Sequence, residues 1–204
     1  MPKRQVFFSF KYLDDFDRVN QIRNMGVIEG DSIVSDNEWE EVKQTPEKIK
    51  KWIEDQMDNR SCVIVCIGEN THDSYYCLYE IERAWKLGKG LLGIHIHNIN
   101  DLDAKKCSKG INPFSKFSIK IDEKNVLLSD IVQVYDPVVA KNKNNDNCSS
   151  YGDIKDNLAD LIEDAIKLRE QYSEAIDISK SGNLSNQARV SQVSNPPKQW
   201  LSKE

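Results

Sequence analysis

The run from Ser61 to Ile67 constrains the fold most strongly, because its residues are apolar and largely β-branched without strict alternation. Gly68-Glu69-Asn70 closes the run. A strand that is apolar at successive positions is covered on both faces, which is typical of parallel sheets flanked by helices. We therefore predict a central, parallel strand over these residues.

Further strands and helices alternate around this central strand. Apolar runs predict strands over Val6–Phe10 and Leu91–His97. Three helical patterns lie between the strands: one capped by Asp14 or Asp15 and ended by Gly26, one beginning at Thr45-Pro46-Glu47, and one from Ser74 to Gly88. Repeated strand–helix units imply a flavodoxin-like, doubly wound parallel α/β sheet, with ligands at the carboxyl ends of its strands.

The remaining segments carry weaker patterns. Short apolar pairs predict a strand that ends near Val34, residues 101–125 read as a long loop, and a last strand is drawn from 126–128 and 131–135. A polar stretch over 141–147 precedes an amphipathic helix with Ile154, Leu158 and Leu161 on one face. The expected organisation is an α/β domain over 1–140, a polar break and C-terminal helix over 141–178 that packs on the domain or on a partner, and a flexible tail over 179–204.

Composition excludes several classes of partner and site. The formal net charge is −5 and the lysines are spread along the chain, so we expect no nucleic-acid partner. The apolar runs fall far short of the roughly 20 residues that span a bilayer, and the first residues do not resemble a secretory signal, so we expect a cytoplasmic protein with no membrane partner. Five cysteines without a C-x-x-C pair indicate neither a disulfide framework nor a zinc site.

Familiar catalytic motifs are missing, since the sequence has no G-x-G-x-x-G after a strand, no P-loop, no G-x-S-x-G and no H-E-x-x-H. Polar and aromatic residues instead follow the predicted strands. They are Ser9-Phe10-Lys11-Tyr12, Ser35-Asp36 with Trp39 nearby, and Glu69-Asn70-Thr71. We expect all of them to open on one edge of the sheet.

Two further kinds of residue have alternative interpretations. Glu80 lies on the helical wheel at the boundary between the apolar and the polar face, which suits either a half-buried catalytic carboxylate or, like Glu82, an ordinary flanking charge. Pattern alone favours the flanking charge. His95 and His97 alternate with isoleucines and should face one side of the sheet. We interpret both as structural histidines and assign no metal.

Six segments of the chain carry a recognisable combination of motifs: Lys3 to Tyr12, Arg18 to Asn24, Trp39-Glu40, Ser61 to Gly68, Tyr79-Glu80-Ile81 and Gly93 to Asn98. Through these segments the sequence resembles the TIR-like family of bacterial Thoeris anti-phage systems over roughly residues 3–115. The resemblance implies a TIR fold and an enzyme that cleaves the nicotinamide–ribose bond of NAD⁺, with Glu80 as the catalytic residue. It also implies a cyclic or modified ADP-ribose signal for an effector protein, a phage component as trigger, and a possible homo-oligomer.

The expected chemistry needs NAD⁺ as substrate and no separate cofactor. A carboxylate can stabilise the oxocarbenium-like ribose that forms as nicotinamide leaves, and aromatic side chains can stack on the bases and exclude water. The expected NAD⁺ contacts are Phe8, Ser9, Phe10, Tyr12, Asp36, Trp39 and Tyr76. Phe8 and Phe10 fall on the same side of their strand, where core packing is the commoner role.

Two other functions remain open at this point. A TIR-like adaptor or phage sensor without catalysis would use the same edge and the C-terminal helix to bind protein. A phospho-acceptor receiver domain has the same fold class, but the acidic pair expected directly after its first strand is replaced by Phe8-Ser9-Phe10. We rank the receiver domain last.

Overall fold

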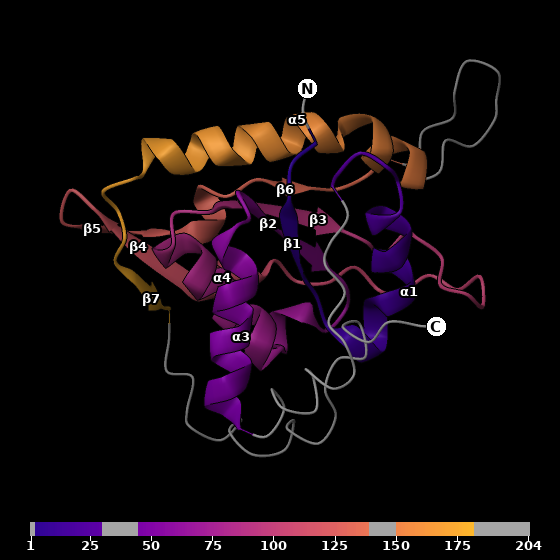
Figure 1. Cartoon of the computed structure of the whole chain (residues 1–204), viewed down its shortest axis with the longest axis horizontal. Coiled ribbons are helices and arrows are strands. Elements are labelled where there is room, and N and C mark those ends of the chain that lie inside the picture. The colour runs from indigo at the N-terminus through magenta and orange to yellow at the C-terminus, as the bar shows by residue number, and fades with distance from the viewer. Residues whose placement is uncertain (1–2, 30–44, 139–149, 182–204) are drawn as a thin grey trace.

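A computed structural model describes residues 3–29, 45–138 and 150–181. Its centre is a four-stranded sheet with the order β1-β2-β3-β6, in which every neighbouring pair is parallel (Figure 1). The strands are β1 (Val6–Ser9), β2 (Cys62–Ile67), β3 (Gly90–His95) and β6 (Val134–Tyr135). Strand β2 lies between β1 and β3, which confirms the predicted central, parallel strand.

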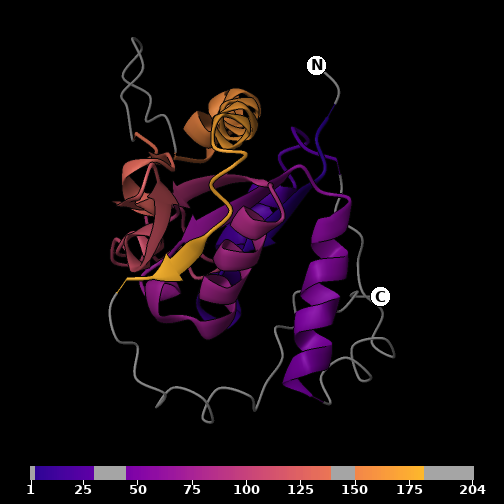
Figure 2. The ribbon, with the colours of Figure 1, turned by 90° about the vertical axis from the view of Figure 1, so that its left-hand side faces the viewer.

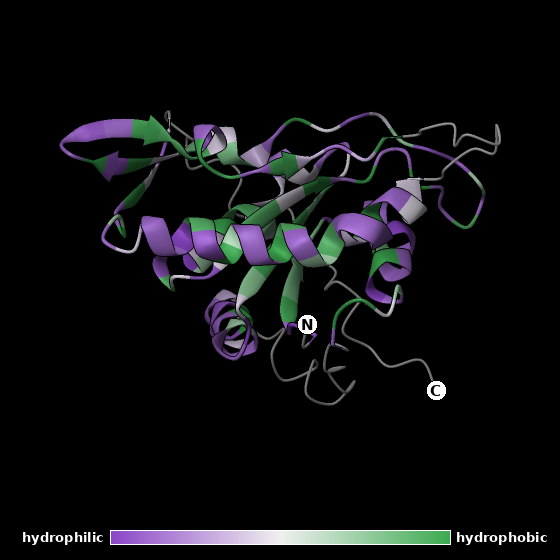
Figure 3. Ribbon diagram, turned by 90° about the horizontal axis from the view of Figure 1, so that it is seen from above, coloured by the Kyte–Doolittle hydropathy of each residue, from purple (hydrophilic) through white to green (hydrophobic). Residues whose placement is uncertain are grey.

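Helices cover both faces of this sheet, which confirms the doubly wound α/β class. One face carries α1 (Tyr12–Arg23) and α5 (Ser150–Gln171), and the other carries α3 (Pro46–Asp58) and α4 (Tyr75–Lys86). Figure 2 shows α5 end-on above the sheet, on the side away from α4. In Figure 3 the strands are mainly hydrophobic, whereas α5 alternates hydrophobic and hydrophilic residues as it crosses them. The C-terminal helix therefore completes the helical layer on its face of the sheet.

The alternation of side chains along a strand divides the core into two clusters. Phe7 and Val63 pack under α3 and α4, while Phe8 and Ile64 pack under α1 and α5. Ser9 lies two residues beyond Phe7, so its side chain belongs to the face of α3 and α4. This assignment decides which strand-end residues can meet Glu80.

A second, antiparallel sheet occupies part of the segment that was predicted to be a loop. Its order is β5-β4-β7, with β4 (Phe117–Ile121), β5 (Lys124–Leu127) and β7 (Ile178–Lys180), and the short helix η2 (Pro113–Lys116) precedes it. The loop prediction for 101–125 is wrong here, because the turn between β4 and β5 uses Asp122 and Glu123 with positive φ values of 45° and 64° instead of glycine. Strand β7 takes in the first residues of the predicted tail.

Local sequence signals predict the first residue of α3 correctly but not that of α1. Thr45 caps α3 as predicted, because its Oγ1 accepts a hydrogen bond of 3.2 Å from the backbone N–H of Lys48. Helix α1 begins earlier than predicted, at Tyr12, and Lys11 at its N-cap makes no side-chain cap. Asp14 and Asp15 lie inside its first turn. The predicted strand ending near Val34 falls outside the described residues.

The described part of the chain contains no helix with the length and apolar character that a membrane crossing requires. Its longest helix, α5, runs for 22 residues and carries acidic and basic side chains along its length. This amphipathic pattern matches its position across the face of the sheet.

Candidate active site

Glu80 lies in the second turn of α4 and points toward the sheet. Its side chain is only 4% exposed, so the predicted boundary position is wrong. A helical wheel describes one helix, whereas α4 packs against β1 on one side and α3 on another. Strand β1 covers the flank on which Glu80 lies, because Ser9 of β1 contacts its carboxyl.

Ser9, the last residue of β1, is brought together with Glu80. Its hydroxyl is fully buried and contacts the Glu80 carboxyl, which lowers the pKa of that carboxyl. Cys77, one turn before Glu80, also contacts the Ser9 hydroxyl. Among the described residues, none lies at both the distance and the angle of a well-formed hydrogen bond to Ser9 Oγ. The hydroxyl is therefore available to the carboxylate or to a ligand.

Burial dominates the electrostatics of Glu80. It raises the pKa of the carboxyl to about 8, and the contact with Ser9 only partly opposes this shift. The side chain is consequently protonated for the most part at neutral pH. A cation bound beside it would favour the ionised form, so the site is suited to a positively charged ligand.

Tyr76 lies one helical turn before Glu80 and is half-buried. Its ring meets that of Tyr75 edge-on, with centroids 5.3 Å apart. Burial raises the pKa of its hydroxyl, and the charges of Tyr75, Glu47 and Glu80 raise it further. Of the predicted NAD⁺ contacts, Tyr76 and Ser9 are therefore the ones that the structure brings to Glu80.

Phe8, Phe10 and Tyr12 pack on the face of the sheet under α1 and α5, so the structure does not bring them to Glu80, and their contact with NAD⁺ stays a prediction. Phe8 and Phe10 are 4% and 6% exposed and pack in the core with α1 and α5. The ring of Tyr12 packs on Phe16 at a centroid distance of 4.9 Å. Alternation along β1 puts Phe8 and Phe10 together, as expected, but away from Glu80. Asp36 and Trp39 lie outside the described residues.

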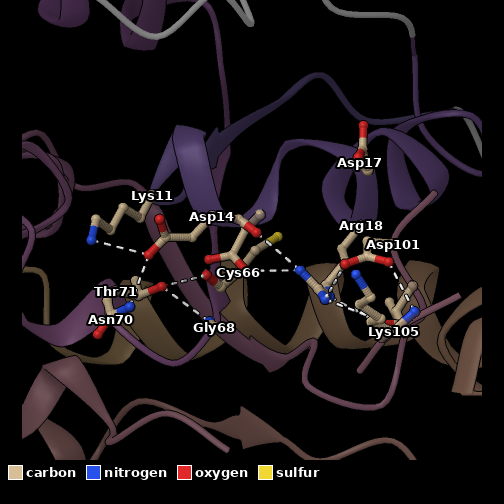
Figure 4. Close-up of polar contacts among 12 residues, drawn as sticks. Lys11, Asp14, Asp17, Arg18, Cys66, Gly68, Asn70, Thr71, Asp101 and Lys105 are labelled. Carbon is tan, nitrogen blue, oxygen red and sulfur yellow. Dashed lines mark hydrogen bonds and ion pairs between the residues drawn. The ribbon is translucent and has the colours of Figure 1, made fainter. Parts of the chain in front are cut away.

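The carboxyl end of β2 is closed, contrary to the expectation of an open edge along the whole sheet. Thr71 is fully buried, and its Oγ1 accepts from the Gly68 N–H at 3.0 Å and donates to the Cys66 carbonyl at 3.2 Å (Figure 4). Gly110 crosses this end so closely that a Cβ at its position would lie 1.9 Å from the Gly68 carbonyl oxygen. Thr71 and Gly110 therefore have structural roles here.

The sequence analysis missed a second buried acid on the other face. Asp15 is 1% exposed, and burial raises its pKa to about 7 despite Arg18 Nη1, which lies 3.8 Å from its carboxylate. Arg18 in turn donates to the carbonyl oxygens of Ile99 and Lys105 and so ties the loop after β3 to α1 (Figure 4). Asp15 shares a helical spacing with Val19, and this was the available signal of burial.

The two histidines share a side, as alternation predicts, because their rings meet edge-on at 5.8 Å. Burial lowers the pKa of His95 to about 4, so its imidazole is neutral at physiological pH. Within residues 3–29, 45–138 and 150–181, no group of three or more His, Cys, Asp or Glu side chains is arranged to hold a metal ion. The described cysteines are free thiols.

The part of the chain that builds this site is similar to known proteins. Residues 7–101 match the family model of the TIR-like domain of Thoeris protein ThsB. Over 120 residues the chain is 37% identical to a Bacillus cereus (strain MSX-D12) protein named "Putative cyclic ADP-D-ribose synthase ThsB1". The aligned region covers 56% of this chain and 62% of that relative. Ser9 and Glu80 both fall inside the family match, so the residues of the candidate site belong to the part of the chain that is similar to the TIR-like domain of Thoeris protein ThsB.

Proposed function

We propose that this protein cleaves the nicotinamide–ribose bond of NAD⁺ and converts the dinucleotide into a cyclic or modified ADP-ribose signal. The observation that carries the proposal is the buried Glu80 carboxyl, which meets the Ser9 hydroxyl at the carboxyl end of β1. The cyclic ADP-D-ribose synthase name of the Bacillus cereus relative supports the same substrate and product class.

The ionisation of Glu80 fits a substrate that arrives as a cation. NAD⁺ carries its positive charge on the nicotinamide ring, and this charge next to Glu80 favours loss of the carboxyl proton. Nicotinamide then departs as a neutral molecule, and the positive charge moves to the ribose. The Glu80 carboxylate stabilises that oxocarbenium-like ribose inside a site from which water is largely excluded.

Ser9 and Tyr76 have supporting roles in this proposal. The Ser9 hydroxyl donates a hydrogen bond to the ionised Glu80 and holds one carboxylate oxygen in place. Tyr76, half-buried one turn away, offers a ring surface to the nicotinamide or the ribose. Exclusion of water favours capture of the ribose by a nucleophile of the same ADP-ribose molecule, which yields a cyclic product instead of the hydrolysed one.

We further propose that the product activates an effector protein, that a phage component triggers synthesis in the cytosol, and that the active form is a homo-oligomer. The similarity of residues 7–101 to the TIR-like domain of Thoeris protein ThsB supports this proposal. A trigger would leave the resting protein silent, so activity is best sought in infected cells.

The deciding experiment compares wild type with Glu80→Gln in phage-infected cells by mass spectrometry of nucleotides and by nicotinamide release. Glu82→Gln is the matched control, because Glu82 lies on the same helix and pairs with Lys86 at 2.6 Å. We expect Glu80→Gln to abolish the ADP-ribose product and Glu82→Gln to retain it. Equal product from wild type and Glu80→Gln would refute the catalytic role, and turnover in neither would favour a non-catalytic adaptor.

A further inference from the structure

Basic side chains from separate parts of the chain lie in a cluster around Asp73, directly before α4. Lys116 Nζ lies 2.6 Å from one carboxylate oxygen of Asp73, and His72 Nε2 lies 3.0 Å from the other. The hydrogen bond from Lys116 lowers the pKa of Asp73, and the charge of Lys11, across the end of β1, lowers it further. Asp73 is therefore an anion that pairs with one lysine and feels the charge of a second.

The exposure of these side chains is uneven. The Asp73 side chain is 68% exposed, whereas those of Lys116 and Lys11 are 23% and 31% exposed. Lys116 ends η2, whose residues Pro113 and Phe114 are buried, so its backbone is held in place. The Asp73 side chain can thus rotate into solvent more easily than the Lys116 side chain can move away from the cluster. An incoming anion can take the place of its carboxylate.

Lys11 has a comparable partner. Its Nζ lies 3.0 Å from Asp14 Oδ2, and the same oxygen accepts a hydrogen bond of 2.9 Å from Asn70 Nδ2 (Figure 4). Because Asn70 already bonds this oxygen, Asp14 keeps a partner when Lys11 turns to another anion. Lys11 is therefore also available to an incoming ligand.

The cluster also lies at the right place relative to Glu80. Ser74, the residue after Asp73, is the N-cap of α4, so the positive end of a 12-residue helix dipole points toward the cluster. Glu80 lies six residues further along α4, roughly 9 Å along the helix axis. Ser9, whose fully buried hydroxyl contacts the Glu80 carboxyl, marks the reacting end of the same site. A dinucleotide with its nicotinamide ribose at Glu80 would place its phosphates toward the start of the helix.

We infer that Lys11 and Lys116 bind the pyrophosphate of NAD⁺ and that the Asp73 carboxylate is the internal counter-ion that the pyrophosphate displaces. This inference rests on the proposed function, because it takes the nicotinamide ribose to lie at Glu80. The two lysines are binding residues and do not touch the bond that breaks. Their removal should weaken the Michaelis complex and leave the chemical step unchanged.

The kinetic test uses Lys11→Ala, Lys116→Ala and Asp73→Asn, with Lys120→Ala as the control because Lys120 pairs with Glu123 at 2.7 Å on the β4–β5 hairpin. Each lysine variant should raise KM for NAD⁺ about tenfold with kcat unchanged, as expected for loss of one charged contact. Asp73→Asn should lower KM. Cleavage of nicotinamide riboside, which has the same scissile bond but no phosphate, should be the same in all variants.

A binding measurement separates this inference from the proposed function. Calorimetry with inorganic pyrophosphate should show salt-sensitive binding to wild type, weaker binding to each lysine variant and tighter binding to Asp73→Asn. Pyrophosphate binding without any NAD⁺ turnover, in infected cells as well as in the purified protein, would refute the proposed function and retain the anion site. NAD⁺ turnover with no pyrophosphate binding, or equal KM changes for NAD⁺ and nicotinamide riboside, would refute the anion site alone.

Discussion

The carboxyl of Glu80 is buried against a serine hydroxyl, and burial outweighs that contact in setting its pKa. A core position would ordinarily hold an apolar residue, because a buried acid costs free energy of folding unless it stays protonated. In the proposed reaction, the core disfavours the negative charge of the Glu80 carboxylate, and the positive charge of the bound NAD⁺ compensates it. The same burial that destabilises the carboxylate therefore strengthens its attraction for a developing cation.

Ser9 tunes this ionisation, which gives a test at the level of one hydroxyl. The profile of kcat/KM for NAD⁺ reports the ionisation of the free enzyme, so it should rise with pH and level off above about 8, the pKa of Glu80. Ser9→Ala removes the contact that lowers this pKa and should move the inflection to higher pH. Steady-state kinetics between pH 6 and 10 would measure it.

The control for this profile is Ser118→Ala, because Ser118 Oγ bonds Ser179 Oγ at 3.1 Å in the small antiparallel sheet and has no contact with Glu80. An inflection at the same pH in wild type and Ser9→Ala would show that Ser9 does not act on the Glu80 ionisation.

Among the elements, α4 carries Glu80, and its far end is fixed by α5. Arg169 of α5 donates to the Trp85 carbonyl from Nε and Nη2 at 3.2 and 2.9 Å, and its guanidinium lies 4.5 Å from the Trp85 ring. Trp85 belongs to the last turn of α4, where carbonyl groups lack partners within the helix and favour a cation. Through this contact the C-terminal helix holds the helix that bears the site.

Arg169→Met keeps much of the apolar length of the side chain but removes its charge and its hydrogen bonds. We expect a loss of about 2–3 kcal/mol in the free energy of unfolding, since the buried Trp85 carbonyl loses charged donors and the ring loses its cation. Urea denaturation would measure the loss. Lys167→Met is the matched control on the same helix, because Lys167 is 67% exposed and its nearest acid, Asp164, lies 3.9 Å away. Equal losses in the two variants would contradict this role of Arg169.

At the scale of the whole molecule, the sequence predicts the parts of the fold that depend on local pattern. The β-branched run of β2 and the cap at Thr45 are local signals, and both predictions are confirmed. The sequence does not predict the hairpin of β4 and β5, because Asp122 and Glu123 form its turn without glycine. Short apolar runs without a turn signal do not distinguish a strand from a loop.

The candidate site was only partly predictable for a related reason. The approach of Ser9 to Glu80 joins residues far apart in the chain, and helical periodicity contains no information on it. Alternation pairs Phe8 with Phe10, but the side on which they lie depends on which helices cover each face. The burial of Glu80 likewise depends on the packing of α4 against β1.

The two buried acids together should make the stability of the molecule depend on pH. Burial raises the pKa of Glu80 to about 8 and that of Asp15 to about 7 in the folded protein, far above their unfolded values. The folded state therefore holds protons that the unfolded state has lost, and the free energy of unfolding falls as pH rises toward these values. His95, with its pKa lowered to about 4, acts in the opposite direction, and this contribution fades as pH rises above its unfolded value of 6.5.

Between pH 6.5 and 8 the two acids outweigh the opposing contribution of the histidines, and there the free energy of unfolding should fall by about 2 kcal/mol. Denaturant unfolding at several pH values would measure this slope. Glu80→Gln with Asp15→Asn should flatten it and leave the protein more stable than wild type at pH 8, because neither amide ionises. Glu82→Gln should keep the slope of wild type. A wild-type protein with constant stability across the window would mean that Glu80 and Asp15 ionise at their unfolded pKa values, and the substrate would then not be needed to draw the proton from Glu80.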